Sequence, residues 1–518
     1  MIERQHLQQA RNDLGRRLAE LRKARGLIQK DVAVRIPTAR STYGMVECGQ
    51  QVVDRIFWQR CDSLLNAQGQ LVAAYDSYQN LYAHYQAQQA EAARRARWAA
   101  VADLDTEPAE PGHTLAVTDH EAAAEPRTAI ASLLDVTMVD SAARRTGVDR
   151  WTVSAPGGQH FPGALIDVEM YPAVDDGRIL ATIAHAAADL RWRRPVQRRL
   201  VLGHVDTPDR ESVFALDSRQ AYRRLVGTNH DSRLLIPRAY QLDAITAAVL
   251  WAVANLDLSL LLDDARLDAA QAAASDYQHL TRSAVSRDLA DDLDPVSRLW
   301  LGSTFCADHI RRHTTILSDV PLYWTREQRG EEASTWLLFR HKLHYLCQTA
   351  EHFRNAAQPM TRMFCVPPPA VTTSSTSERI LLLLAVALME SLNIQTAITD
   401  EPEYGTLSGL VLDQRHAIMA SWIRADGVWH VDVTDQPTVL AEYRDALGHV
   451  RAHSVIAADT PADRLRNLAD HLNLDWHWLQ RRCADLGQYG FGGLAEPRSR
   501  HLCLDGVNQA CRFVGTLP

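Results

Sequence analysis

The chain has 518 residues, of which 46% are hydrophobic and 23% are charged, and its formal net charge is −8. These values are ordinary for a soluble globular protein of about three domains. A chain of this length can bury a large core, so it needs neither a structural metal nor a disulfide framework to fold.

The eight cysteines are scattered, and none belongs to a CxxC pair. This spacing excludes a zinc ribbon or finger and favours reduced thiols in the cytosol. The first residues, MIERQHLQQARNDLG, are polar and unlike a signal or transit peptide. The most apolar run, Ile380–Met389, is too short to cross a bilayer. We therefore expect a cytoplasmic protein without membrane contact.

Two amphipathic helices are predicted first in the chain. Residues 11–25 place Leu14, Leu18 and Leu21 on one helical face. A second, shorter helix follows and ends at Pro37, because proline has no N–H to donate and disfavours a helical residue before it.

A third helix is predicted over residues 39–48. Thr38 is a candidate N-cap, and Gly49 ends the helix in the way that a helix C-terminus prefers. Tyr43 and Val46 would form its buried side. Its other side would face whatever the helix is pressed against.

The N-terminal segment differs in charge from the rest of the chain. Residues 1–66 contain 12 Lys and Arg and 7 Asp and Glu, a net charge of +5, so the remaining residues carry −13. A small basic segment on an acidic protein is an electrostatic footprint for phosphates. The basic side chains lie around the two short helices: Arg16, Arg17, Arg22, Lys23, Arg25, Lys30 and Arg40.

The stretch from Leu14 to Gly49 resembles, without a gap, the helix-turn-helix of XRE/Cro-like phage-repressor regulators. The resemblance is carried by LGRRLAELRKARG and then by Leu27, Gln29, Ala33, Ile36, Arg40, Ser41, Thr42, Glu47 and Gly49. The chain departs from that family at Pro37, Ala39 and Ile28, where Gly, Ser and Thr are usual. The whole pattern also looks like the large regulators of actinomycete bacteria.

The resemblance implies a DNA-binding surface on the third helix. Residues of the family that match Arg40 and Ser41 face base edges in the major groove, and Gly44 and Met45 lie on the same predicted face. The family residue that matches Gln29 lies near a phosphate. We expect phosphate contacts from Gln29, Arg16, Arg17, Lys30 and Thr42.

Two further helices are predicted after the helix-turn-helix. The fourth turns Ile56, Phe57, Cys61, Leu64 and Leu65 inward and completes a domain over residues 1–68. The fifth spans residues 69–100 and carries Leu71, Tyr75, Tyr78, Tyr82 and Tyr85 at steps of 4, 3, 4 and 3, which is coiled-coil spacing. Either this helix lies on its own domain, or the stripe is a dimer seam for a homodimer that binds two half-sites.

The remaining chain is predicted to be a linker and an effector region. Residues 101–126 hold seven Asp and Glu and no Lys or Arg, so we expect a flexible acidic linker over 101–128. Residues 129–518 would form one α+β region, or two lobes at 129–357 and 358–518. The predicted fold class is α+β, mainly α, with an N-terminal five-helix helix-turn-helix domain.

Hydrophobic periodicity places the main elements of residues 129–518. Strands are predicted at 165–170, 199–205, 395–399, 409–412, 417–424 and 428–433, the last two joined as a hairpin by Ala-Asp-Gly. Helices are predicted at 180–193, 236–262, 296–317, 331–357, 376–395 and 460–488. The helices at 236–262 and 376–395 are apolar on most faces, so we expect them to be buried.

Residues 377–435 are similar in layout to the core of transglutaminase-like cysteine hydrolases. His416 and Asp432 fall where that family has its histidine and aspartate. The position of the nucleophilic cysteine falls near Ser377 or Glu378, and neither residue supplies a thiolate. The resemblance therefore implies no hydrolase activity, and we expect no catalytic residues.

Other chemistry-bearing patterns are weak. Two helical segments place Zn²⁺-type ligands on one face, Cys306, His309 and His313 in the first and His341, His344 and Cys347 in the second, but the spacings match no established finger. The chain has no Walker loop, no GxGxxG after a strand and no GxSxG elbow. We expect no metal and no cofactor.

A mixed charge run follows Trp324, in WTREQRGEEASTW. Most such runs form a solvated face or a helix start with acids in its first turn. The alternative is that Arg326, Glu327 and their neighbours line a ligand pocket.

These observations predict a sequence-specific DNA-binding transcription regulator that acts as a homodimer on double-stranded DNA. Its C-terminal region would sense a signal, such as a small-molecule ligand, or set the oligomeric state. The alternative is an enzyme, of degenerate transglutaminase-like type, with an appended DNA-binding domain. The size of residues 129–518 is the motive for this alternative, because dimerisation alone requires far less chain.

Overall fold

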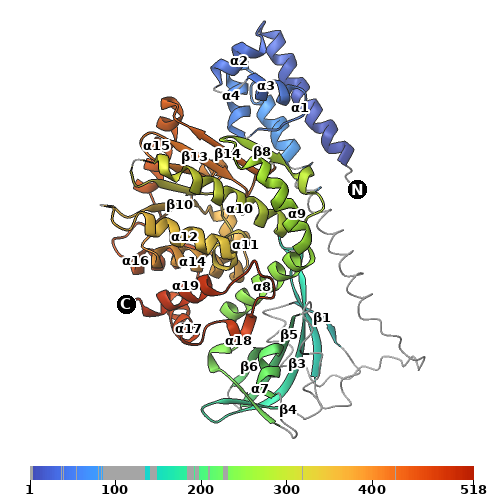
Figure 1. Cartoon of the computed structure of the whole chain (residues 1–518), viewed down its shortest axis with the longest axis vertical. Coiled ribbons are helices and arrows are strands. Elements are labelled where there is room, and N and C mark those ends of the chain that lie inside the picture. The colour runs from blue at the N-terminus through green and yellow to red at the C-terminus, as the bar shows by residue number, and fades with distance from the viewer. Residues whose placement is uncertain are drawn as a thin grey trace, which may run out of the picture. The chain divides into compact units, whose positions relative to one another are not determined.

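The structure of the chain is a computed structural model (Figure 1). It describes residues 4–79 except 37, 39 and 54; residues 81, 82 and 85; 135–139; 149–183; 192; 198–207; 210–225; and 232–518 except 318, 357 and 426. Contacts divide the chain into two compact units, Met1–Leu115 and Ala116–Pro518. The predicted linker at 101–128 and most of the predicted helix beyond residue 79 lie outside the described residues. The first unit is helical and the second combines sheets with helices, which confirms the α+β class.

The N-terminal unit packs five helical segments around one apolar core. Four are α1 (Arg4–Ala24), α2 (Gln29–Arg35), α3 (Arg40–Glu47) and α4 (Arg55–Leu65), and residues 70–79 form the fifth. Each helix contributes large buried side chains to this core: Leu14, Leu18, Val32, Tyr43, Val46, Phe57, Trp58, Leu65, Leu71 and Tyr75. The helix-period patterns of the sequence therefore mark the buried faces correctly.

The fifth helical segment lies on its own domain. Leu71, Tyr75 and Tyr78 are buried in the core of the N-terminal unit, and the ring of Tyr75 stacks on that of Trp58 with centroids 6.0 Å apart. Tyr82 is half-buried and stacks on Tyr78 at 6.1 Å. These contacts occupy the first three residues of the predicted dimer seam and favour the interpretation in which this helix lies on its own domain. Dimerisation itself stays a prediction.

A carboxylate from α4 anchors the start of this segment. The buried Asp62 accepts hydrogen bonds from the backbone N–H groups of Gly69, Leu71 and Val72, at 2.6, 2.8 and 3.3 Å. The first N–H groups of a helix have no partner within the helix, so a side chain that accepts three of them fixes the helix in place.

The C-terminal unit begins with a seven-stranded sheet. Its strands are β1 (Asp135–Val139), β2 (Asp149–Ala155), β3 (Ala164–Asp175), β4 (Ile179–Ile183), β5 (Arg198–Thr207), β6 (Arg210–Asp217) and β7 (Ser232–Ile236). The order β1-β2-β3-β4-β7 is extended by β5, which pairs parallel with β3 and antiparallel with β6. The strands predicted at 165–170 and 199–205 lie within β3 and β5. The short helix α7 (Ser218–Leu225) follows β6.

The helix predicted over residues 180–193 is wrong at its start, because residues 180–183 belong to β4. Ile179, Ala181 and Ile183 are buried in alternation, and the strand pairs with β3 and β7. A spacing of two places these residues on one face of a strand, whereas the run of alanines that follows favoured a helix.

The second sheet is also seven-stranded, in the order β11-β10-β9-β12-β13-β14-β8. Its strands are β8 (Ser283–Ser286), β9 (Leu322–Thr325), β10 (Thr361–Cys365), β11 (Gln395–Thr399), β12 (Leu410–Leu412), β13 (Ala417–Ser421) and β14 (Gly427–Thr434). β9, β10 and β11 run parallel, and the other pairs are antiparallel. The hairpin of β13 and β14 was predicted, whereas β8, β9 and β10 were not.

Helices cover both faces of the second sheet. One face contacts α15 (Pro437–Ala452) through Trp324, Met363 and Leu440. The other packs against the main core, which includes α8 (Ala244–Leu262), α10 (Pro295–His313), α11 (Gly330–Leu338), α12 (Arg340–His352) and α14 (Thr376–Ser391). The remaining helices are α9 (Asp264–Ala274), α13 (Pro368–Thr373), α16 (Pro461–His471), α17 (Trp476–Tyr489), α18 (Gly492–Ala495) and α19 (Asp505–Thr516).

Of two long predicted helices, one is central as expected and the other is divided. α8 is long and apolar enough to cross a membrane by composition alone, but 83% of that window is buried in the protein core, in keeping with the expectation of a central helix. The helix predicted at 331–357 is two helices, because Phe339 is extended (ψ 118°) and pairs with Leu502 as an isolated bridge. Phe339 is fully buried, so tertiary packing overrides the local helical pattern.

Candidate nucleic-acid interface

The third helix, α3, has one buried side and one exposed side. Tyr43 and Val46 are buried in the core of the N-terminal unit. Arg40 and Ser41 are exposed, and 40% of the surface of Met45 is accessible. The side of α3 that was predicted to contact bases is therefore exposed at Arg40, Ser41 and Met45 and half-buried at Gly44. Contact with DNA stays a prediction.

Glycine ends both α1 and α3 in the same way. Gly49 has φ +67°; its N–H donates to the carbonyl of Val46 at 3.0 Å, and the N–H of Gln50 donates to that of Met45 at 2.9 Å. This pair of bonds is a Schellman motif, which requires a left-handed residue after the helix. Gly26, with φ +65°, ends α1 by the same pattern.

The backbones of α1 and α3 approach each other closely at Gly15. A side-chain carbon built there would lie 2.4 Å from the carbonyl oxygen of Val46 and 2.6 Å from that of Glu47. Because no side chain fits in that space, the glycine sets the distance between α1 and the end of α3.

A buried polar network joins α1, α2 and α3. The guanidinium of Arg22 donates from Nε and Nη2 to the two carboxylate oxygens of Glu47, at 2.6 and 3.0 Å. Its Nη1 donates to the backbone carbonyl of Leu27 at 2.7 Å. Gln29 adds a third donor to the same carboxylate, from Nε2 to Oε2 at 2.8 Å. The side chains of Arg22 and Glu47 are only 10% and 5% exposed.

This network involves two residues that the sequence analysis singled out. Arg22 was grouped with the basic side chains that surround the helices, but it is buried and its charge is neutralised by Glu47. Gln29, predicted to contact a phosphate, holds Glu47, and its amide lies 3.6–3.9 Å from where a Cβ of Gly44 would stand. The network therefore positions α3. A phosphate contact by Gln29 stays a prediction.

The other predicted phosphate contacts lie at or near the surface. Arg16, Arg17 and Lys30 are exposed, and Thr42 is half-buried. Arg16 is 64% exposed and pairs with Asp13 at 2.7 Å on its own helix. An exposed pair of this kind is weak and can be exchanged for a phosphate.

The comparison with known families decides what kind of helical unit this is. Residues 13–75 match the model of a family described as a helix-turn-helix domain. The N-terminal unit is a DNA-binding fold of the helix-turn-helix type. The match covers the second half of α1, then α2, α3, α4 and the first part of the fifth helical segment. Searches of curated proteins and of solved structures found no match.

Sequence reasoning missed the exposed apolar residue at the start of α2. Ile28, 60% exposed, is the N-cap of α2 and directly precedes Gln29. The signal was available, because Ile stands where the resembling family has Thr and is unusual at an N-cap.

The transglutaminase-like positions do not form a catalytic set among the described hydrogen bonds and ion pairs. The carboxylate of Glu378 accepts from the backbone N–H of Ser375, at the start of α14. Asp432 lies 3.4 Å from the guanidinium of Arg282, and His416 lies 3.8 Å from Asp413.

The side chains of the two candidate metal-ligand sets likewise do not come together. Within the described ranges no group of three His, Cys, Asp or Glu side chains could hold a metal ion. Cys306 is buried, whereas the rings of His309 and His313 pack on each other at 4.4 Å. His341 bonds to Ser303 at 2.8 Å between the ring Nε2 and the hydroxyl.

Proposed function

We propose that this protein is a sequence-specific DNA-binding transcription regulator of the XRE/Cro-like kind, similar to the large regulators of actinomycete bacteria. It acts on the nucleoid in the cytoplasm as a homodimer. The C-terminal unit senses a signal by binding rather than by catalysis.

One observation carries the DNA-binding proposal. In a helix-turn-helix domain, α3 exposes Arg40, Ser41 and Met45 while its opposite side is locked into the core. A recognition helix needs such a rigid helix with a polar outer face, because direct readout places side chains against base edges in the major groove. The basic excess of this segment supplies the phosphate term of the affinity.

The test begins by selecting the preferred site from randomised duplex DNA with the full-length protein. Arg40→Ala should relax the preference at one base pair and weaken binding there by about 1–3 kcal/mol. Arg178→Ala, which removes an exposed arginine from the β3–β4 turn of the C-terminal unit, is the matched control and should leave the site preference unchanged. If Arg40→Ala selects the same site with wild-type affinity, α3 does not read bases through this residue.

The homodimer is tested on the selected site. A dimer that reads two half-sites predicts a palindrome with centres one helical turn, or a multiple of it, apart. Sedimentation of the protein with a labelled duplex should give two chains per site. A single, asymmetric site bound by one chain would contradict the dimer but not DNA binding.

A further inference from the structure

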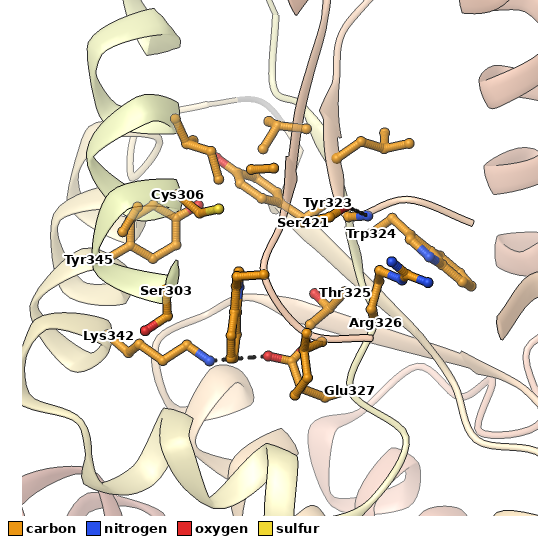
Figure 2. A pocket seen from close by; sticks show the side chains of 18 of the residues that line it. Ser303, Cys306, Tyr323, Trp324, Thr325, Arg326, Glu327, Lys342, Tyr345 and Ser421 are labelled. Atoms are coloured by element: carbon orange, nitrogen blue, oxygen red, sulfur yellow. Dashed lines mark hydrogen bonds and ion pairs between the residues drawn. The ribbon is translucent and has the colours of Figure 1, made fainter. Parts of the chain in front are cut away.

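The C-terminal unit contains a cavity of about 50 Å³, beside the end of β9 (Figure 2). Within its lining, α10 supplies Ser303 and Cys306, β9 supplies Tyr323, α12 supplies Lys342 and β10 supplies Arg362, and α11, β12 and β13 contribute further residues. Half-buried side chains such as Ile310 and Trp422 also line it. A cavity of this volume has room for a few water molecules or a group of that size.

The buried arginine in this cavity is not fully hydrogen-bonded. Arg362 is 3% exposed and lies beside Tyr323 in the parallel register of β10 and β9. Its Nη1 donates to the hydroxyl of Thr325 at 3.1 Å, whereas its Nε and Nη2 have no partner with hydrogen-bond geometry, and the hydroxyl of Tyr345 also interacts with the guanidinium. Its guanidinium lies over the rings of Tyr323 and Trp336, at 4.6 and 4.8 Å. The aromatic rings stabilise the cation without satisfying its N–H donors.

The other buried charges of the cavity are already paired. The ammonium of Lys342 donates to Glu327 at 3.1 Å and to Thr335 at 2.8 Å, and it lies between the rings of Trp336 and Trp422 at 3.8 and 3.9 Å. Glu327 also accepts from the indole N–H of Trp336. Figure 2 shows this lysine–glutamate pair.

The lining therefore carries excess positive charge. Glu327 is paired with Lys342, so Arg362 is left as a buried cation without a carboxylate partner among the described ion pairs. The hydroxyl of Tyr323 is a further buried group without a hydrogen-bond partner. Burying unmet N–H donors on a charged group is costly, so a site of this kind favours an anion with oxygens that can accept them.

The cavity lies at the carboxyl end of β9. This strand has β10, which is parallel to it, on one side and β12, which is antiparallel to it, on the other. Thr325, the last residue of β9, and the following Arg326 and Glu327 line the cavity at that end.

We propose that this cavity binds the carboxylate group of a small organic acid, with its two oxygens on the Nε and Nη2 of Arg362. These two N–H groups form one edge of the planar guanidinium and match a carboxylate in a bidentate pair. The hydroxyl of Tyr323 is an additional donor. This inference rests on the proposed sensing role of the C-terminal unit and names the chemistry of the signal.

The test uses saturation-transfer NMR on the full-length protein, with acetate and propionate as probes and chloride at equal ionic strength as the background. We expect saturable binding of both acids. Arg362→Lys keeps the charge but removes the fork, and should weaken binding at least about tenfold. Tyr323→Phe keeps the ring that stacks on the guanidinium and removes only the hydroxyl, so a smaller loss is expected.

A control separates lost binding from lost folding. Arg464→Lys alters another buried arginine, which is already paired with Glu390 at 2.6 Å, and should lower thermal stability without changing acetate binding. No saturable signal in the wild-type protein, or equal signals in wild type and Arg362→Lys, would overturn the proposal. So would a preference for inorganic phosphate over both acids. Binding of the same preparations to the selected DNA is measured in parallel, so failure of the cavity and failure of the regulator are distinguishable.

Discussion

The pair of Arg22 and Glu47 offers a quantitative test of how the reading helix is held. Glu47→Ala would leave the guanidinium of Arg22, 10% exposed, without its carboxylate, and would remove the acceptor of Gln29. Breaking a buried ion pair from one side costs about 3–5 kcal/mol. Because a domain is stable by only about 5–15 kcal/mol, this loss should leave α3 close to unfolding.

Hydrogen exchange of the full-length protein measures this loss locally. Peptides from α1 and α3 should lose protection equivalent to about 3–5 kcal/mol in Glu47→Ala. The double variant Arg22→Met/Glu47→Leu removes both charges and should recover most of the loss, because an apolar pair of similar volume is often no less stable than a buried ion pair.

The control for this experiment is the exposed ion pair on α1. Asp13→Ala breaks the contact between Asp13 and Arg16, whose side chains are 40% and 64% exposed, respectively. This substitution should lower the free energy of unfolding by less than about 1 kcal/mol. A loss below about 1 kcal/mol in Glu47→Ala, or a double variant less stable than Glu47→Ala, would refute the reasoning.

Three further predictions concern binding and pH. Gly44→Ala should raise the stability of α3 by about 1 kcal/mol, because its Cβ meets only the amide of Gln29 at 3.6 Å, and chemical denaturation would measure this gain. The same substitution should weaken DNA binding by adding a methyl group to the exposed side of α3; unchanged affinity in fluorescence anisotropy would contradict this second effect. Lys30→Ala should weaken binding to all sequences and reduce the salt slope by about one per chain, whereas a loss confined to one sequence would exclude a phosphate contact. Burial lowers the pKa of His309 to about 4, below its ordinary value of 6.5. Between these pH values the unfolded chain binds a proton at this histidine that the folded protein does not bind, so up to about 3 kcal/mol of the free energy of unfolding is lost as pH falls from 6.5 to 4. Urea unfolding should show a smaller loss in His309→Leu, and parallel curves would contradict this assignment.

The helix-turn-helix could be predicted because its signals are local. The spacing of Tyr43 and Val46 and the glycine at position 49 are read within one helix, and all three occupy the expected places. The partner of Arg22 could not be found in this way, because Glu47 is 25 residues away and a buried arginine has the same letter as an exposed one.

The candidate ligand site of the C-terminal unit could not be predicted for a related reason. Arg362 sits in a five-residue strand, TRMFC, that is buried on both faces. Such a strand has no alternation of polar and apolar residues, so it gives no period-two signal. The charge run with Glu327 was visible, but it suggested a solvated face or a helix start as readily as a pocket. The run does begin α11, yet Glu327 is 1% exposed.

The carboxylate of Asp62 has a mechanical consequence. It holds three amides at the beginning of the fifth helical segment, and a bidentate pair between Arg55 and Asp76, at 3.0 Å for both contacts, fastens the next turns to α4. Residues 70–79 are therefore held to α4 at two points. The buried carboxylate is the stronger attachment, because the side chains of Arg55 and Asp76 are 40% and 44% exposed.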